Sequence, residues 1–189
     1  MYKLLPDYIK EKITISDPDL ETVLSYFKPQ KFKKNEILVN PGEKPQRIYF
    51  VVSGCLRIFF LTEGGAEATR HFAFENQFAT ALVSFITGEI SKEYVQAVED
   101  TEVYFIWQSD FYELLKIIPQ WEKLYRHYLE YAYVTNTNRL MSFITLDATE
   151  RYRQLLAQNP GVVMRMPNKM VASYLNISQE TLSRLKSKA

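Results

Sequence analysis

The sequence predicts an α+β fold: a β-roll of the jelly-roll type with a helical N-terminus, then one long helix, then a C-terminal helix-turn-helix. Between residues 31 and 107, short β-branched and aromatic runs alternate with turn residues, as in β-sandwiches and barrels. Residues 121–144 contain neither glycine nor proline, which leaves room for about six helical turns. In residues 167–189 the apolar positions are spaced so that two short helices can cross over one small core.

The first 27 residues have the apolar spacing of helices, and Ser16 and Asp17 before Pro18 indicate where the second of them begins. Residues 80–86 interrupt the β-rich region with a less strand-like segment, for which we expect a short helix. Six runs in that region predict strands: EILV, RIYFVV, LRIFFL, ATRHFAF, YVQAV and VYFIW.

A helix is expected over residues 110–118, started by Ser109 or Asp110 and stopped by Pro119. The long helix follows, and we place a hinge at residues 147–149. The predicted domains are therefore a β-roll domain over 1–118, a dimerisation helix over 119–146 and a helix-turn-helix domain over 147–189.

The long helix has side chains near a 3.5-residue period, a spacing typical of helices that pair with a second copy. This predicts a homodimer, although polar members make the seam weaker than a leucine zipper. The alternative is that the helix packs on its own β-roll. The seam consists of Leu124, Tyr128, Tyr131, Thr135, Asn138 and Met141.

Three residues of the terminal segment suit a helix-turn-helix. Ala172 is small enough for a close crossing of the two helices. Asn176 stands where the chain must turn through a left-handed conformation, which asparagine tolerates better than other non-glycine residues. Ser178 is a favourable N-cap for the second helix.

The second helix carries polar side chains that can reach base edges and phosphates of DNA. An ordinary helical hairpin with a solvated basic tail is the alternative. Charge favours DNA, because residues 151–189 hold seven basic side chains and one acidic, whereas the rest of the chain holds 16 basic and 21 acidic. The candidate DNA-binding residues are Lys169, Ser178, Gln179, Glu180, Thr181, Ser183, Arg184, Lys186 and Lys188.

Composition sets further limits. With 189 residues and 47% hydrophobic content, the chain can bury a substantial core without disulfides. Its single cysteine, Cys55, cannot form an internal disulfide, which favours a reducing compartment and a structural role. No apolar run approaches the length of a membrane span, and the N-terminus has no signal-peptide character. We therefore expect a soluble, cytoplasmic protein.

The order of β-roll, long helix and helix-turn-helix resembles the Crp/Fnr family of bacterial transcription regulators, over nearly the whole chain. The motifs that carry the resemblance are PGEKPQRIYFVVSGCLRIFF at 41–60, YVQAVEDTEVYFIWQSDF at 94–111 and ISQETLSRLK at 177–186. The resemblance implies a cyclic-nucleotide-binding-like β-roll, a homodimer on double-stranded DNA and contact with RNA polymerase. It also implies base contacts from Gln179, Glu180 and Arg184, with Gln179 in place of the family's arginine.

Two departures from the family pattern stand out. The chain ends at Ala189, where most members continue into a β-hairpin wing. In the nucleotide pocket, Thr80 and Ala81 stand at the family's Gly-Glu positions, and Ser91 and Lys92 stand at its Arg-Ser positions. An alanine cannot accept the ribose hydrogen bond and Ser91 cannot offset a phosphate charge, so we expect no cofactor and no control by cyclic AMP. Lys92 leaves a modified anion or cyclic-nucleotide site open, as well as an unrelated ligand or a purely dimerising β-roll.

Other classes fit less well. A cupin-like metal enzyme needs clustered ligands, whereas the chain has only His71 and His127, on different predicted elements. One cysteine cannot hold an iron-sulfur cluster, and a haem site remains open only through His71 or Cys55. No nucleophile elbow or P-loop occurs, so we expect no enzyme. A sensor that acts through protein partners without DNA is the remaining alternative.

Overall fold

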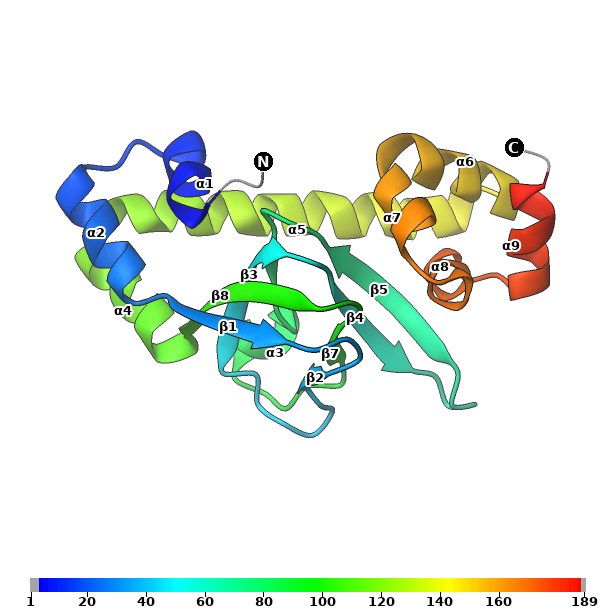
Figure 1. The fold of residues 1–189 in the computed structure, drawn as a ribbon, viewed down its shortest axis with the longest axis horizontal. Helices are drawn as coiled ribbons and strands as arrows, with labels where there is room; N and C mark the ends of the chain where they lie inside the picture. Colours follow the sequence, from blue (N-terminus) through cyan, green and yellow to red (C-terminus); the bar gives the residue numbers. More distant parts are fainter. Residues whose placement is uncertain (1–3, 188–189) are drawn as a thin grey trace. The chain divides into compact units, whose positions relative to one another are not determined.

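The computed structural model describes residues 4–187 (Figure 1). These residues divide into two compact units. The first unit holds the chain up to Ile58 together with Phe72–Glu130. The second holds Phe59–His71 together with the chain from Tyr131 onward. The outer part of one β-hairpin is thus grouped with the C-terminal helices, which the sequence did not predict.

The first unit begins with α1 (Leu5–Lys12) and α2 (Asp17–Ser25). Ser16 caps α2 by accepting a hydrogen bond from the backbone N–H of Asp19, and Pro18 lies in the first turn, where its missing N–H costs nothing. The predicted start of this helix is confirmed.

Two four-stranded sheets form the β-roll, one in the order β1-β8-β3-β6 and the other in the order β2-β7-β4-β5. The pairs β1–β8, β8–β3, β3–β6 and β2–β7 are antiparallel. The strands are β1 (Lys28–Phe32), β2 (Ile37–Val39), β3 (Arg47–Ser53), β4 (Leu56–Leu61), β5 (Glu67–Ala73), β6 (Phe78–Ala79), β7 (Tyr94–Ala97) and β8 (Thr101–Trp107).

Strand β3 explains why the roll has two apolar layers. Its side chains alternate between the sheet faces, as the period of two requires. Ile48 and Phe50 are buried in one cluster, and Tyr49 and Val51 are buried in the other. A strand covered on both faces has the continuous apolar run seen in RIYFVV.

The six predicted strands are all present, whereas β1 and β6 are not among them. Only Phe32 of β1 is buried, so its sequence KPQKF lacks the alternation of a half-buried strand. It becomes a strand because it pairs along its length with β8, from Lys28 opposite Phe105 to Phe32 opposite Thr101. Figure 1 shows the two strands side by side.

Helix α3 (Leu82–Thr87) confirms the short helix expected after β6. Helix α4 (Gln108–Ile117) starts two residues earlier than predicted, with Trp107 at the N-cap in place of Ser109 or Asp110. Helix α5 (Pro119–Thr145) is the long helix. The first turns of α5 belong to the core of the first unit, because Trp121 and Leu124 are buried in it. Tyr128 also packs against this core, with its ring 5.8 Å from that of Phe78.

The second unit contains the rest of α5, the outer part of the β4–β5 hairpin and four short helices. Asp147 and Glu150 form a reciprocal capping box at the start of α6, which makes the predicted hinge a defined helix start. The sequence analysis did not predict α7. The helices are α6 (Ala148–Gln158), α7 (Pro160–Arg165), α8 (Asn168–Leu175) and α9 (Gln179–Lys186). Within residues 4–187, no helix is both long and apolar enough to cross a membrane.

The turn between β3 and β4 depends on Gly54. Its φ is +95°, and a Cβ there would lie 2.5 Å from Thr101 Oγ1 and 2.7 Å from the Asp100 carbonyl oxygen. Gly65, at the tip of the β4–β5 hairpin, has a φ of +76°, but a Cβ there would meet nothing within 4 Å.

We therefore expect Gly54→Ala to destabilise the protein more than Gly65→Ala. In both variants a left-handed alanine lowers the free energy of unfolding by about 1 kcal/mol. In Gly54→Ala, steric overlap lowers it by about a further 1–3 kcal/mol. Urea denaturation of both variants measures the difference. Equal losses of unfolding free energy would contradict the close packing at Gly54.

Candidate nucleic-acid interface

The α8–α9 pair has the geometry of a helix-turn-helix. Ala172, Leu175 and Leu182 are buried between the helices. Asn176 adopts a left-handed conformation with φ 52° and ψ 53°, and the backbone N–H of Ile177 donates to the Ala172 carbonyl over 3.1 Å. Both the close crossing at Ala172 and the left-handed turn at Asn176 are confirmed.

Ser178 fixes the start of α9. Its Oγ accepts the backbone N–H of Thr181 over 3.1 Å, which confirms the predicted N-cap. The pKa of the Glu180 carboxyl is lowered, first by a hydrogen bond from the Ser178 side chain and then by one from the backbone N–H of Glu180 itself. The positive charge of Arg184 lowers it by a smaller amount. Glu180 is thus held ionised at the positive end of the helix.

The solvent face of α9 presents Gln179, Glu180, Ser183 and Arg184, all exposed. Thr181 is partly buried, and its Oγ1 accepts a hydrogen bond from Arg184 Nη2 over 3.2 Å. This bond uses only one of the five guanidinium N–H groups, so Arg184 keeps donors that point outward. Four of the candidate DNA-binding side chains therefore share one exposed helix face.

The lysines are placed differently. Lys169 forms an ion pair with Glu67 of β5, with Nζ 3.1 Å from Oε1. Lys186 is partly buried and donates to Asn168 Oδ1 over 2.7 Å and to the Val163 carbonyl over 3.5 Å. Lys188 lies outside the described residues. Two of the three candidate DNA-binding lysines thus have partners within the protein.

The first helix of the motif contacts the β4–β5 hairpin. The backbone N–H of Thr69 donates to Ser173 Oγ over 3.3 Å, and the two hydroxyls are also hydrogen-bonded. Arg139 of α5 donates from Nη2 to the carbonyls of Thr69, over 2.8 Å, and Tyr174, over 2.7 Å. Its guanidinium lies 3.9 Å from the centre of the Tyr174 ring.

The four β-roll positions predicted to line a ligand pocket differ in exposure and in their hydrogen bonds. Thr80 and Ser91 are buried, and their hydroxyls donate to the carbonyls of Arg47 and Glu93, each over 2.9 Å. Ala81 is fully buried in the apolar core, and the Lys92 side chain is exposed. The hydroxyl protons are thus already used within the protein.

The candidate metal or haem ligands are dispersed. Cys55 is fully buried, His127 is exposed on α5 and His71 is partly buried on β5. In the described part of the chain, no group of three or more histidine, cysteine or carboxylate side chains is arranged to hold a metal. Burial, helped by Arg70 and Arg139, lowers the pKa of His71 to about 4.

Comparison with known proteins gives the same architecture. The model of the cyclic nucleotide-binding domain matches residues 29–117. The cAMP-activated global transcriptional regulator CRP of Salmonella typhimurium is 23% identical over 180 residues, 90% of this chain and 86% of that protein. The Cyclic AMP receptor protein of Thermus thermophilus is 25% identical over 179 residues, 90% of this chain and 81% of that protein. Residues 29–117 thus form a cyclic nucleotide-binding domain, and over about 90% of its length the chain is similar to transcription regulators of the Crp/Fnr type.

Solved structures show the same fold. FixK2 from Bradyrhizobium japonicum superposes with a TM-score of 0.74 at 19% identity, covering 86% of this chain and 83% of that one. The c-di-GMP responsive regulator CLP of Xanthomonas campestris superposes with a TM-score of 0.73 at 16% identity, covering 92% and 91%. The predicted resemblance to the Crp/Fnr family and the predicted fold class are confirmed, and the curated relatives are transcription regulators rather than enzymes.

Sequence reasoning missed three arginines. Arg57 is 1% exposed within β4, and Arg139 and Arg151 hold backbone carbonyls in the second unit. Arg57 could have been noticed as a charge within the apolar run LRIFFL. Nothing in the helical spacing distinguishes Arg139 or Arg151 from solvated arginines.

His71 should make the stability of this protein depend on pH. Its pKa of about 4 lies below the value of about 6.5 in an unfolded chain, so the unfolded state binds more protons between these values. This histidine therefore contributes stability that is present above pH 6.5 and lost as the pH falls toward 4, by up to about 3 kcal/mol.

We expect His71→Gln to become more stable relative to the native chain as the pH falls from 6.5 to 4, measured by urea denaturation. His127→Gln, at the exposed histidine, is the matched control and should keep a constant difference. A constant difference for His71→Gln as well would contradict the burial of His71.

Proposed function

We propose that this Crp/Fnr regulator binds specific DNA sequences as a homodimer, inserts α9 into the major groove and is not controlled by cyclic AMP bound in its β-roll. The observation that carries the proposal is the exposed polar face of α9 on a formed helix-turn-helix. The curated relatives are named as cAMP-activated transcription regulators, which supports a DNA-binding role.

Base reading is assigned to Gln179, Glu180 and Arg184. Glutamine suits adenine, arginine suits guanine and glutamate can accept from cytosine. Ser178, Thr181 and Ser183 can add contacts at the start and side of the helix. Lys169, Lys186 and Lys188 are assigned to phosphates, where Lys169 would exchange Glu67 for the DNA backbone.

Dimerisation is assigned to an exposed apolar face on the second half of α5. The predicted seam is divided, because Leu124 and Tyr128 contact the first unit's core and Tyr131, Thr135 and Asn138 line a pocket of the second unit. Next to this seam, a stripe of exposed apolar side chains follows the three- and four-residue spacing, seven residues in all, that helix pairing requires. It consists of Tyr133, Val134, Leu140, Met141 and Ile144, each at least 50% exposed.

The buried positions that would hold a cyclic nucleotide carry no positive charge. At the family's nucleotide positions this chain offers a buried alanine and two hydroxyls bonded to backbone carbonyls. A cyclic phosphate placed there would lose its hydration without gaining a cation, at a cost of several kcal/mol. Lys92 directly follows Ser91 in the sequence, but its side chain is exposed to solvent.

Arg184→Ala should weaken binding to the preferred duplex by about 1–3 kcal/mol and relax the preference at one base position. Lys186→Ala should weaken binding to all duplexes alike and lower the salt slope by about one. Selection from a random duplex library, followed by salt-dependent affinity measurements, checks both. Arg126→Ala, at an exposed arginine of the first unit, is the control.

An unchanged base preference in Arg184→Ala would remove that residue from the reading set. The selection is repeated with cyclic AMP, with cyclic GMP and without nucleotide. A motif bound without nucleotide is expected. A motif that appears only with nucleotide would contradict the assignment of the β-roll, and no motif in any condition would favour a sensor that acts through protein partners.

The dimer face predicts the behaviour of a Leu140→Glu, Ile144→Glu double variant. Each burial contributes about 1.5–3 kcal/mol, so the dimer dissociation constant should rise at least about 100-fold. Sedimentation velocity measures this. The control is Val83→Glu with Ile90→Glu, two exposed apolar residues of the first unit, and equal effects of both pairs would contradict the assignment.

A further inference from the structure

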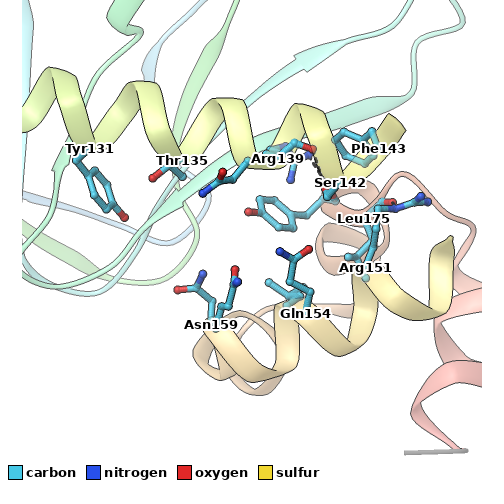
Figure 2. A pocket seen from close by; sticks show the side chains of 13 residues that line it. Tyr131, Thr135, Arg139, Ser142, Phe143, Arg151, Gln154, Asn159 and Leu175 are labelled. Atoms are coloured by element: carbon cyan, nitrogen blue, oxygen red, sulfur yellow. Dashed lines mark hydrogen bonds between the residues drawn. The ribbon is translucent and has the colours of Figure 1, made fainter. Parts of the chain in front are cut away.

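A pocket of about 230 Å³ opens within the second unit, between the second half of α5, α6 and α8. Figure 2 shows Tyr131, Thr135 and Arg139 extending from α5 on one side, and Gln154 and Asn159 facing them from the other. Its 13 lining residues include two arginines, Arg139 and Arg151, and no aspartate or glutamate. The pocket is therefore positively charged and otherwise lined by neutral side chains.

Both arginines donate to backbone carbonyls of the second unit. Arg139 donates from Nη2 to the carbonyls of Thr69 and Tyr174, and it also has a side-chain hydrogen bond with Tyr174. Arg151 donates from Nη1 to the Leu146 carbonyl over 2.7 Å and from Nε to the Leu175 carbonyl over 3.3 Å. Among residues 4–187 no carboxylate pairs with either guanidinium, and the hydrogen bonds of Arg151 leave its Nη2 group unused.

Two neighbouring, partly buried guanidinium groups with unused N–H donors have an unfavourable free energy unless an anion binds to both. Both guanidiniums lie against one ring, at 4.8 Å for Arg139 and 5.3 Å for Arg151 from the centre of Phe143, so one ligand can reach both. Burial lowers the pKa of the Arg139 guanidinium, the positive charges of Arg70 and Arg151 lower it further, and Tyr174 opposes the shift; a bound anion would also oppose it.

We propose that this pocket binds a small phosphate-bearing anion, held by Arg139 and Arg151. Two guanidiniums match the double charge of a phosphate and can each bind it through paired hydrogen bonds. Ser142, Asn138 and Gln154 add neutral hydrogen-bonding groups. The volume is below the range of about 300–1,000 Å³ typical of drug-sized ligands, so the ligand is the size of pyrophosphate or a small organic phosphate.

The site is built wholly from the second unit and shares no residue with Thr80, Ala81, Ser91 and Lys92 of the β-roll. One wall is α8, the helix before the candidate recognition helix, and Arg139 holds the carbonyl of Tyr174 at its C-terminal end. A role for the ligand as an effector rests on the proposed function, whereas binding itself does not.

Isothermal titration calorimetry of the full chain with inorganic pyrophosphate, at constant ionic strength and without DNA, tests the site. The native chain should bind one equivalent. Arg151→Gln removes one cation, and Gln154→Glu adds a carboxylate while leaving both arginines in place. Each should raise the dissociation constant at least about tenfold.

Arg153→Gln is the matched control, because Arg153 is an exposed arginine on the same helix that does not line the pocket. Its dissociation constant should stay within about twofold of the native value, as expected for a screened surface charge. Absence of saturable binding by the native chain, or an equal loss in Arg153→Gln, would overturn the proposal. If Arg151→Gln does not fold, Gln154→Glu decides, and neither result depends on DNA binding.

Discussion

Burial of Trp121 fixes the start of α5, and both units of the structure depend on that helix. The Trp121 ring lies 5.4 Å from Phe111 and 6.0 Å from Phe27, both at steep angles, in a fully buried aromatic cluster. Aromatic burial of this size holds the first turns of α5 to the β-roll. The same continuous helix then supplies Arg139 to the second unit, so one element carries the principal anchors of both.

Arg139 anchors the second unit as Trp121 anchors the first, but with polar contacts. One nitrogen joins a strand of the hairpin to the C-terminal end of α8, and the planar guanidinium also stacks on Tyr174. Only arginine combines a fork of donors with a flat face in this way. The contact explains why the outer hairpin is grouped with the C-terminal helices rather than with the rest of the β-roll.

Many of the basic side chains in the C-terminal part of this protein already have partners within it. The basic excess of residues 151–189 is the feature that points to DNA, yet Lys169 pairs with Glu67, Lys186 bonds to Asn168 and Arg151 holds two carbonyls. These contacts orient the helix-turn-helix and cover part of its cationic surface. Arg184 donates a hydrogen bond only to Thr181 of the same helix among the described residues, so its guanidinium is the cation on the exposed face of α9 that can best bind DNA.

The sequence by itself determined the features that depend on neighbours in the chain. Apolar spacing, Ser16 and Ser178 as caps, and left-handed Asn176 predicted the helices and the motif, because helix hydrogen bonds and caps join residues three or four apart. Only the tertiary structure decided β1, which exists through pairing with β8, the divided seam of α5, and the pocket of Arg139 and Arg151. These depend on residues far apart in sequence, from Thr69 to Tyr174, and no local pattern encodes which of them meet.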